Sequence, residues 1–296
     1  MAFAGGGALA AAVSQAGGFG LIGGGYGNAQ WLDEQLDLAG EARVGVGFIT
    51  WSAQRSPELV TQAIERGAAA IMLSFGDPSV FAEEVHRAGV PLICQCQSLS
   101  HVQDAVDAGA EIVVAQGAEA GGHGSSRGTM SFVPEVSDFL SEHAPDTTLL
   151  AAGGIADGRG LAASLMLGAD GVLIGTRFWA SSEALVHPRH HAAMLAANGD
   201  GTLRTHAPDI VRNLPWPTEF TARVQRNAFI ERWDGRETEL ASAAATEAPP
   251  YLQAFAEGDP DKTAVWFGEA AGLIHEIEPS ARIIDRIVDE AERLIQ

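Results

Sequence analysis

Short apolar runs recur along the first 175 residues, and all of them except 149–152 follow a glycine of the kind that ends a helix in a left-handed residue. Amphipathic stretches of helical length and period separate the runs, for example over 56–66, 80–88 and 99–108. Repeated strand–helix units with nearly continuous apolar strands are typical of a buried parallel sheet. The seven expected strands are 19–22, 43–50, 69–74, 91–95, 111–116, 149–152 and 171–175.

The regularity of this repeat predicts an α/β fold of the (β/α)8 TIM-barrel type, with the first strand missing or truncated. A doubly wound open sheet is the alternative. The alternation of strands and helices ends near residue 181. We therefore assign residues 1–180 and 279–296 to the barrel and residues 181–278 to a mainly helical appendage on the substrate side. An amphipathic helix over 281–294 should return to pack on the barrel.

Acidic residues outnumber basic ones by 38 to 18, which gives the 296-residue chain a formal charge of −20. Such a field repels nucleic acid and anionic membrane surfaces, so we expect neither as a partner. The N-terminus has no basic leader and no apolar run is long enough to span a membrane, which predicts a cytoplasmic protein. Cys94 and Cys96 share one face of an expected strand without metal-ligand spacing, so we expect both to be structural and no metal to bind.

Glycine-containing loops follow the last two expected strands, at 151–158 and 174–178. Paired glycines let backbone amides approach a phosphate, and helix N-termini add a favourable partial charge. Barrels often hold phosphate in the loops after their last two strands. A tight turn is the simpler interpretation of Gly153-Gly154, but two such loops in the two expected places favour phosphate binding.

His123 lies in a glycine-rich loop after the expected strand 111–116, within Gln-Gly-Ala-Glu-Ala-Gly-Gly-His-Gly. Histidine titrates near neutral pH and is the commonest proton-transfer residue. A lone histidine is usually structural or solvated. Its place at the C-terminal end of a barrel strand favours a catalytic base instead. Glu119 and Arg127 are candidates for orienting it.

Two glutamines, Gln95 and Gln116, end apolar strands. A polar residue in that position is costly unless it finds partners, so each is a candidate for a hydrogen bond to a cofactor. The alternative is that they only cap the strands at the barrel rim.

These motifs together resemble the nitronate monooxygenases, formerly called 2-nitropropane dioxygenases, which are FMN-containing barrels. The resemblance runs over nearly the whole chain. It rests on residues 8–23, 44–51, 119–124 (Glu-Ala-Gly-Gly-His-Gly), 152–160 (Ala-Gly-Gly-Ile-Ala-Asp-Gly-Arg-Gly) and 168–178 (Gly-Ala-Asp-Gly-Val-Leu-Ile-Gly-Thr-Arg-Phe). The Gly-Gly-His and Gly-Thr-Arg-Phe segments are fairly specific in combination.

The resemblance implies an FMN-dependent oxidation of nitronates or nitroalkanes to carbonyl compounds and nitrite, with a small-molecule substrate and O2 as partners. It implies that His123 removes a proton from the substrate carbon, while the flavin supplies the redox chemistry. The residues implied to bind FMN are Gly153, Gly154, Gly175 and Thr176 at the phosphate, and Gly47, Gln95, Gln116, Gly121 and Gly122 along the flavin. The sequence leaves open whether the protein is a homo-oligomer.

One departure from the family concerns the start of the chain. The family's first strand ends in Pro-Met, whose backbone touches the flavin. Met1 and Ala2 stand where that strand would end, so the resemblance implies that they also bind the cofactor. In a barrel that lacks one strand, backbone N–H and C=O groups of the neighbouring strands would be left unpaired. We therefore expect a natural start upstream, and weak FMN retention by a chain that begins at Met1.

Other functions share these motifs. NAD(P)H-dependent FMN reductases, of the quinone reductase or enoyl-acyl-carrier-protein reductase type, have the same architecture and Gly-Gly-His loop. The IMP-dehydrogenase type needs a cysteine nucleophile, and residues 117–129 contain none. A non-catalytic flavin-binding module is a third alternative, which a titratable histidine in the site disfavours.

Overall fold

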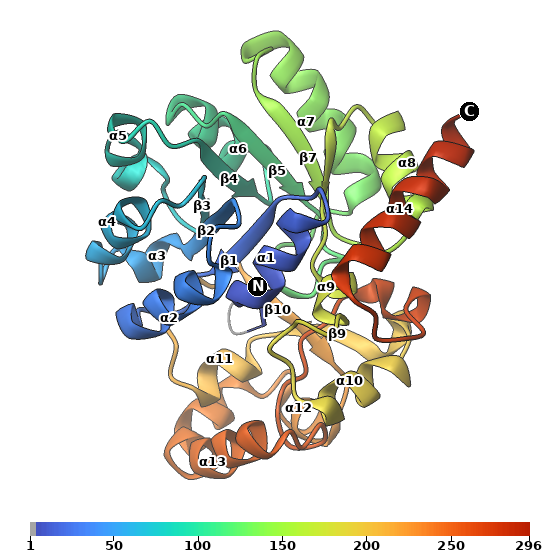
Figure 1. The fold of residues 1–296 in the computed structure, drawn as a ribbon. Helices are drawn as coiled ribbons and strands as arrows, with labels where there is room; N and C mark the ends of the chain where they lie inside the picture. Colours follow the sequence, from blue (N-terminus) through green and yellow to red (C-terminus); the bar gives the residue numbers. More distant parts are fainter. Residues whose placement is uncertain (1–3) are drawn as a thin grey trace.

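Seven parallel strands form the central sheet of the computed structural model, which describes residues 4–296 (Figure 1). The strands are β1 (Gly20–Gly23), β2 (Val44–Ile49), β3 (Ile71–Ser74), β4 (Leu92–Cys96), β5 (Ile112–Gln116), β7 (Thr148–Ala152) and β8 (Gly171–Leu173). They follow one another across the sheet in chain order, without the reversal of a doubly wound sheet. The expected parallel barrel architecture is confirmed. Met1 and Ala2 lie outside the described residues.

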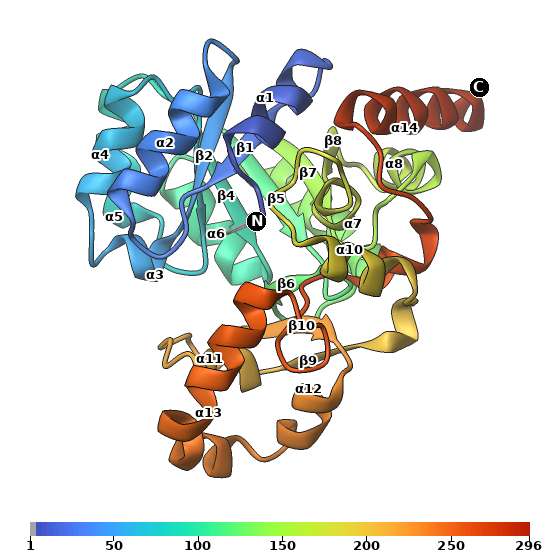
Figure 2. The same ribbon diagram turned by 60° about the horizontal axis from the view of Figure 1, so that its bottom comes forward.

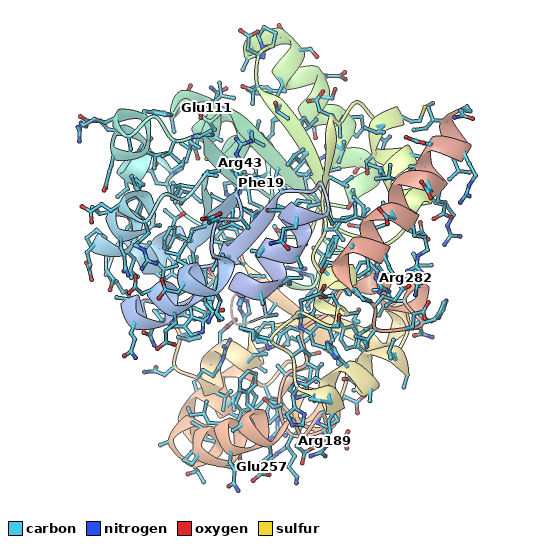
Figure 3. All side chains as sticks on the ribbon, viewed as in Figure 1. Phe19, Arg43, Glu111, Arg189, Glu257 and Arg282 are labelled. Atoms are coloured by element: carbon cyan, nitrogen blue, oxygen red, sulfur yellow. The ribbon has the colours of Figure 1, made fainter. Side chains whose placement is uncertain are left out.

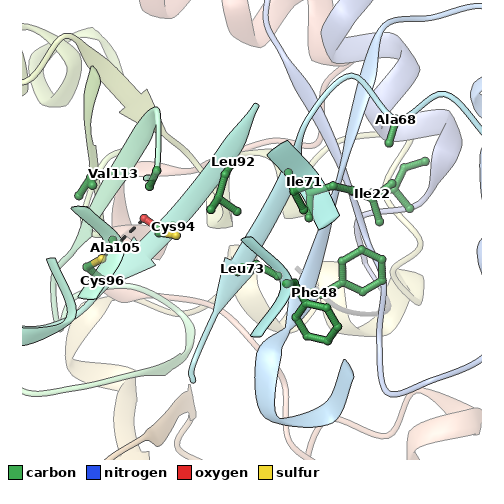
Figure 4. Close-up of a cluster of buried hydrophobic side chains, with 14 of the residues drawn as sticks. Ile22, Phe48, Ala68, Ile71, Leu73, Leu92, Cys94, Cys96, Ala105 and Val113 are labelled. Atoms are coloured by element: carbon green, nitrogen blue, oxygen red, sulfur yellow. Dashed lines mark hydrogen bonds between the residues drawn. The ribbon is translucent and has the colours of Figure 1, made fainter. Parts of the chain in front are cut away.

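Helices cover the outer face of this curled sheet (Figure 1). They are α1 (Gly7–Gln15), α2 (Ala29–Ala39), α3 (Thr50–Ala53), α4 (Glu58–Glu65), α5 (Ser79–Arg87), α6 (Leu99–Asp107), α7 (Thr129–His143) and α8 (Gly158–Met166). Their apolar faces meet the outward side chains of the strands in the main core, where Figure 4 shows Ile22, Ile71 and Leu92 among the buried residues. No helix within residues 4–296 is long and apolar enough to cross a membrane.

Both cysteines are free thiols buried in β4. The Cys96 Sγ donates a weak hydrogen bond to the Cys94 carbonyl oxygen at 3.7 Å (Figure 4). Burial raises the pKa of Cys94 to about 12, which keeps it an unreactive thiol at neutral pH. This environment agrees with a structural role for the pair.

The edge strands β1 and β8 do not pair with each other within the described part of the chain. All four residues of β3 are buried, whereas the residues of β8 are only half buried. A closed barrel would cover this edge with a further strand. At the end of β1, the Gly23 N–H donates to the Gly5 carbonyl oxygen at 2.9 Å, so the segment before α1 lies beside β1.

The appendage after β8 is built mainly from helices around its own buried cluster, which includes Phe229, Trp233 and Tyr251. Its elements are α10 (Pro188–Leu195), η1 (Gly199–Gly201), β9 (Thr202–Thr205), α11 (Ala207–Val211), β10 (Thr221–Gln225), α12 (Ala228–Trp233), α13 (Glu237–Glu257) and η2 (Glu269–Leu273), and the short helix α9 (Thr176–Trp179) joins β8 to them. The two strands were not expected. They form an antiparallel sheet with β6 (Gly122–Gly124), in the order β6-β10-β9, which ties the appendage to the barrel (Figure 2).

The last helix, α14 (Ser280–Ile295), returns to the barrel and packs against α8, as expected (Figure 1). The two helices approach closely at Gly158, where a Cβ would lie 2.5 Å from the Ala291 nitrogen and 2.5 Å from the Glu290 Cβ. The Gly158 N–H also donates to the Glu290 Oε2 at 2.8 Å. A glycine at this helix start therefore allows the contact.

The appendage lies at the C-terminal ends of the barrel strands. Phe19, Arg43 and Glu111 directly precede β1, β2 and β5, and they lie at the end of the barrel away from the appendage (Figure 3). Arg189 and Glu257 lie in the appendage, at the opposite end of the same view (Figure 3). Because barrel enzymes place their active sites at the C-terminal ends of the strands, the appendage covers the functional face.

Candidate active site

His123 lies in the middle of β6, on the loop that follows β5. Its backbone pairs with Ala222 of β10, so the appendage holds the loop from one side. On the barrel side, the Gln116 Nε2 donates to the His123 carbonyl oxygen at 3.1 Å. The histidine on the glycine-rich loop is thus anchored between the end of β5 and the appendage.

The imidazole of His123 pairs with Asp209 of α11. The His123 Nε2 lies 2.8 Å from the Asp209 Oδ2, and the two side chains are only 8% and 3% exposed. The other carboxylate oxygen of Asp209 accepts a hydrogen bond from the Arg212 Nη2 at 3.0 Å. Sequence reasoning missed Asp209, which is 86 residues from His123 in a short helix without a recognisable motif.

The two residues expected to orient His123 lie in other contacts. The Glu119 carboxylate accepts hydrogen bonds from the Thr129 N–H and hydroxyl, the latter at 2.9 Å. Arg127 forms an ion pair with Glu135 of α7. Glu119 therefore closes the His123 loop onto the start of α7, and the imidazole is oriented by Asp209 instead.

Burial lowers the pKa of His123, and this is the largest effect on it. The hydrogen bond and charge of Asp209 raise the pKa, whereas the charges of Arg212 and Arg204 lower it. The net shift is downward, so the imidazole is neutral at pH 7 and able to accept a proton. Among the described residues, the His123 Nδ1 has no hydrogen-bond partner.

Aromatic side chains enclose the imidazole. The Trp216 indole stacks on it, with ring centroids 3.4 Å apart and planes 4° from parallel. The Trp216 Nε1 donates to the Tyr26 hydroxyl at 3.2 Å, which ties the loop before β10 to the loop after β1. Phe75, at the end of β3, lies edge-on to His123 at 6.2 Å. These rings keep water away from the imidazole, which is why burial dominates its pKa.

The two predicted glutamines meet at the end of the barrel. The Gln116 Oε1 accepts from the Gln95 Nε2 at 3.1 Å and from the Gln97 Nε2 at 3.0 Å. Gln97 is only 1% exposed and was missed, although it directly follows β4 and lies two residues after Gln95. Because these bonds fix the Gln116 amide, its Nε2 is directed at the His123 carbonyl. A cavity of about 220 Å³ adjoins Gln95 and Gln97, next to Phe75 and Phe220.

The predicted phosphate loops lie side by side, after the paired strands β7 and β8. Gly153 and Gly154 have φ values of 101° and 75°, which residues with side chains rarely adopt. Within residues 4–296, the backbone amides of Gly154 and Gly175 donate to no protein acceptor, and both glycines are exposed. A Cβ at Gly175 would meet nothing within 4 Å. Free, exposed amides at the ends of adjacent strands fit a phosphate group.

The other predicted flavin residues lie in different surroundings. The Thr176 Oγ1 accepts from the Gly268 N–H at 2.9 Å, so this hydroxyl already has a protein partner. The Gly47 carbonyl oxygen accepts from the Gly24 N–H at 2.7 Å. Gly121 packs against the backbone of residues 267–268, and Gly122 lies beside His123 in β6. The structure thus brings Gly121 and Gly122 to the histidine, and Gly153, Gly154, Gly175 and Thr176 to the neighbouring strand ends.

Comparison with known proteins shows the family. The model of the nitronate monooxygenase family matches residues 41–290. A nitronate monooxygenase of Neurospora crassa is 30% identical, over 98% of this chain and 87% of the relative. The nitronate monooxygenase npaC of Metarhizium robertsii is 32% identical, over 97% of this chain and 88% of the relative.

Solved structures show the same architecture. FabK from Thermotoga maritima superposes with a TM-score of 0.87 at 34% identity, covering 100% of this chain and 91% of that chain. A nitroalkane oxidase from Streptomyces ansochromogenes superposes with a TM-score of 0.81 at 23% identity, covering 98% and 93%. The barrel with its appendage and the family match agree, and the chain belongs to the nitronate monooxygenase family of oxidoreductases.

Proposed function

We propose that this oxidoreductase converts nitronates, and nitroalkanes after removal of a proton, to carbonyl compounds and nitrite with FMN and O2. The observation that carries the proposal is the neutral, buried His123 at the C-terminal end of the barrel, with its Nδ1 unbonded among the described residues. A nitroalkane loses a proton from the carbon next to its nitro group. A general base for that step needs a free lone pair at neutral pH, which His123 offers.

The cofactor residues are proposed as a set. FMN, when bound, would supply the redox chemistry by taking electrons from the substrate and passing them to O2. The amides of Gly154 and Gly175, together with Gly153 and Thr176, would hold its phosphate. The overall charge of −20 makes such backbone donors valuable, because the anionic phosphate gains little from the protein's net field. The residues proposed to line the flavin are Gly47, Gln95, Gln116, Gly121 and Gly122.

His123 acts on the substrate carbon in this proposal. The stacked Trp216 fixes the plane of the imidazole, and Gln116 fixes the backbone that carries it. The aromatic side chains exclude water, which keeps the imidazole neutral before proton transfer. A nitronate already lacks the proton, so its oxidation should depend less on His123.

The second candidate is an NAD(P)H-dependent flavin reductase. It is favoured by the 34% identity to FabK and by the fold shared with the enoyl reductase domain of MlnA, which superposes with a TM-score of 0.73. The two candidates differ in what reduces the flavin. Anaerobic bleaching of the FMN-loaded protein by a nitronate, with none by NADH or NADPH, supports oxidation of nitronates. Bleaching by NADH or NADPH alone would overturn it.

The phosphate site has its own test in Gly175, where a new side chain meets open space. Gly175→Asp places a negative charge beside the proposed phosphate, and Gly175→Asn is its neutral, size-matched control. We expect Gly175→Asp to weaken FMN binding at least about tenfold relative to Gly175→Asn, since about 1.4 kcal/mol corresponds to a factor of ten. Riboflavin lacks the phosphate and should bind both variants equally. Equal FMN affinities would place the phosphate elsewhere.

A further inference from the structure

Asp209 contacts the Nε2 of His123, whereas the other ring nitrogen, Nδ1, is the atom that would act on the substrate. We propose that Asp209 is a positioning residue, which holds His123 in the tautomer whose Nδ1 is basic, and that Arg212 holds the Asp209 carboxylate in place for this task. The proposal rests on the proposed function of His123 as the base.

The tautomer follows from the donor and acceptor inventory. An ionised carboxylate only accepts hydrogen bonds, so the His123 Nε2, 2.8 Å from the Asp209 Oδ2, must carry the hydrogen. In the neutral ring the lone pair is then on Nδ1. A neutral histidine without this partner would divide between two tautomers, and one of them has no lone pair on Nδ1.

Arg212 fixes the position of the Asp209 carboxylate. Its Nη2 donates to the Asp209 Oδ1 at 3.0 Å, so the two carboxylate oxygens have separate partners. The Arg212 Nε donates to the Pro208 carbonyl oxygen at 2.7 Å, and the guanidinium lies 5.0 Å from the centre of the Trp266 ring. The guanidinium is thus held from several sides and does not depend on Asp209 alone for its position.

The charges around His123 set the expected pH dependence. Asp209 raises its pKa, whereas Arg212 on the same helix and Arg204 on β9 lower it. Without the Asp209 charge, burial and the two arginines remain, and all of them lower the pKa of His123. The pKa of His123 then falls further, the base weakens, and the rise of activity with pH moves to lower pH. Asp209 also stabilises the imidazolium that forms when the proton is taken.

The variant Asp209→Asn keeps the size of the side chain but disturbs both partners. An amide has one oxygen, so it cannot accept from Arg212 and from the His123 Nε2 through separate oxygens. If its oxygen faces Arg212, its NH2 faces the His123 Nε2 and favours the tautomer with the hydrogen on Nδ1. Asp209→Asn should therefore remove the base without removing the imidazole.

We expect Asp209→Asn to lower kcat on a neutral nitroalkane at least about 100-fold, the usual scale of general base catalysis. Turnover of the corresponding nitronate should stay within about threefold, because the nitronate has already lost the proton that the base would remove. FMN affinity should not change. Arg212→Gln should also lower kcat on the nitroalkane but less strongly, because the carboxylate remains, and the pKa of His123 should rise because the charge of Arg212 no longer lowers it.

Glu111→Gln is the matched control. The Glu111 carboxylate also lies near a histidine, with its Oε2 3.9 Å from the His86 Nε2, but at the far end of the barrel (Figure 3). The Glu111 Oε2 accepts a hydrogen bond from the Leu92 N–H at 2.8 Å, so Glu111→Gln shows what a change in stability alone does to turnover. The ratio of nitroalkane to nitronate turnover should remain that of the wild type.

Nitrogen-15 NMR of the imidazole tests the proposal without any turnover. Signals that disappear in His123→Gln identify the residue, and they should report a hydrogen on Nε2 in the wild type and a changed tautomer in Asp209→Asn. If the wild type turns over no nitroalkane, the proposed function fails while the tautomer can still be read. A hydrogen on Nδ1 in the wild type, or an unchanged turnover ratio and pH profile in Asp209→Asn, would overturn the role of Asp209.

Discussion

The packing of Gly121 gives a quantitative test of how the His123 loop is held. A Cβ at this position would lie 2.5 Å from the Gly268 nitrogen, 2.5 Å from the Phe267 carbonyl carbon and 2.8 Å from the Phe267 Cα. Ordinary contacts between such atoms are about 3.5–4.0 Å, so the added methyl is roughly 1 Å too close. All three atoms are backbone, and the Gly268 N–H is fixed by Thr176. The His123 loop must therefore move.

The size of the effect follows from this overlap. Overpacking of this kind costs about 1–3 kcal/mol, so Gly121→Ala should lower the free energy of unfolding by about 2 kcal/mol. A shift of about 1 Å in a catalytic group lowers rates about 100-fold, so kcat on a nitroalkane should fall by that order with FMN saturating. Urea unfolding and steady-state turnover measure the two quantities.

Gly122→Ala provides the control in the same loop. Gly122 has a φ of 78°, but a Cβ there would meet nothing within 4 Å. Its cost should be limited to the left-handed backbone, about 1 kcal/mol, without displacement of the loop by a neighbour. If Gly121→Ala unfolds and turns over like the wild type, the close backbone contact does not hold His123 and the reasoning fails.

Two further predictions concern stability. Gly158→Ala should lower the free energy of unfolding by about 1–3 kcal/mol, because its Cβ would lie 2.5 Å from the Ala291 nitrogen of α14. If urea unfolding shows the variant to be at least as stable as the wild type, the close helix contact is refuted. Burial, followed by the charge of His187, lowers the pKa of His190 to about 4, and its Nε2 has no partner among the described residues. The folded-state pKa thus lies below the unfolded value of about 6.5, so this contribution to stability is complete above pH 6.5 and is lost as the pH falls towards 4. Between pH 7 and 4.5, His190→Leu should lose less unfolding free energy than the wild type. Equal losses in the two proteins would contradict this.

The barrel was predictable because its signals are local. Most of the parallel strands are largely buried and read as apolar runs, for example β3, and most of the helices before them are followed by a glycine. Every expected strand overlaps an observed one, for example 91–95 with β4 (Leu92–Cys96). The final helix was equally clear, since an exposed helix on a barrel needs one apolar face.

The appendage and the partners of His123 depend on tertiary contacts. The strands β6, β9 and β10 have only three to five residues each, and β6 consists of Gly-His-Gly. Such segments carry no periodicity, and they become a sheet only because distant parts of the chain meet. Asp209 and Trp216 reach His123 in the same way, from a short helix and a proline-flanked loop. The histidine could be found from its glycine-rich loop, whereas its environment could not.

His123 as a base for carbon acids can be tested with two forms of one substrate. His123→Ala, loaded with FMN, is assayed on a neutral nitroalkane and on the nitronate derived from it. We expect a loss of at least about 100-fold on the nitroalkane, near wild-type turnover of the nitronate and unchanged FMN affinity. Wild-type turnover of the nitroalkane by His123→Ala would contradict it.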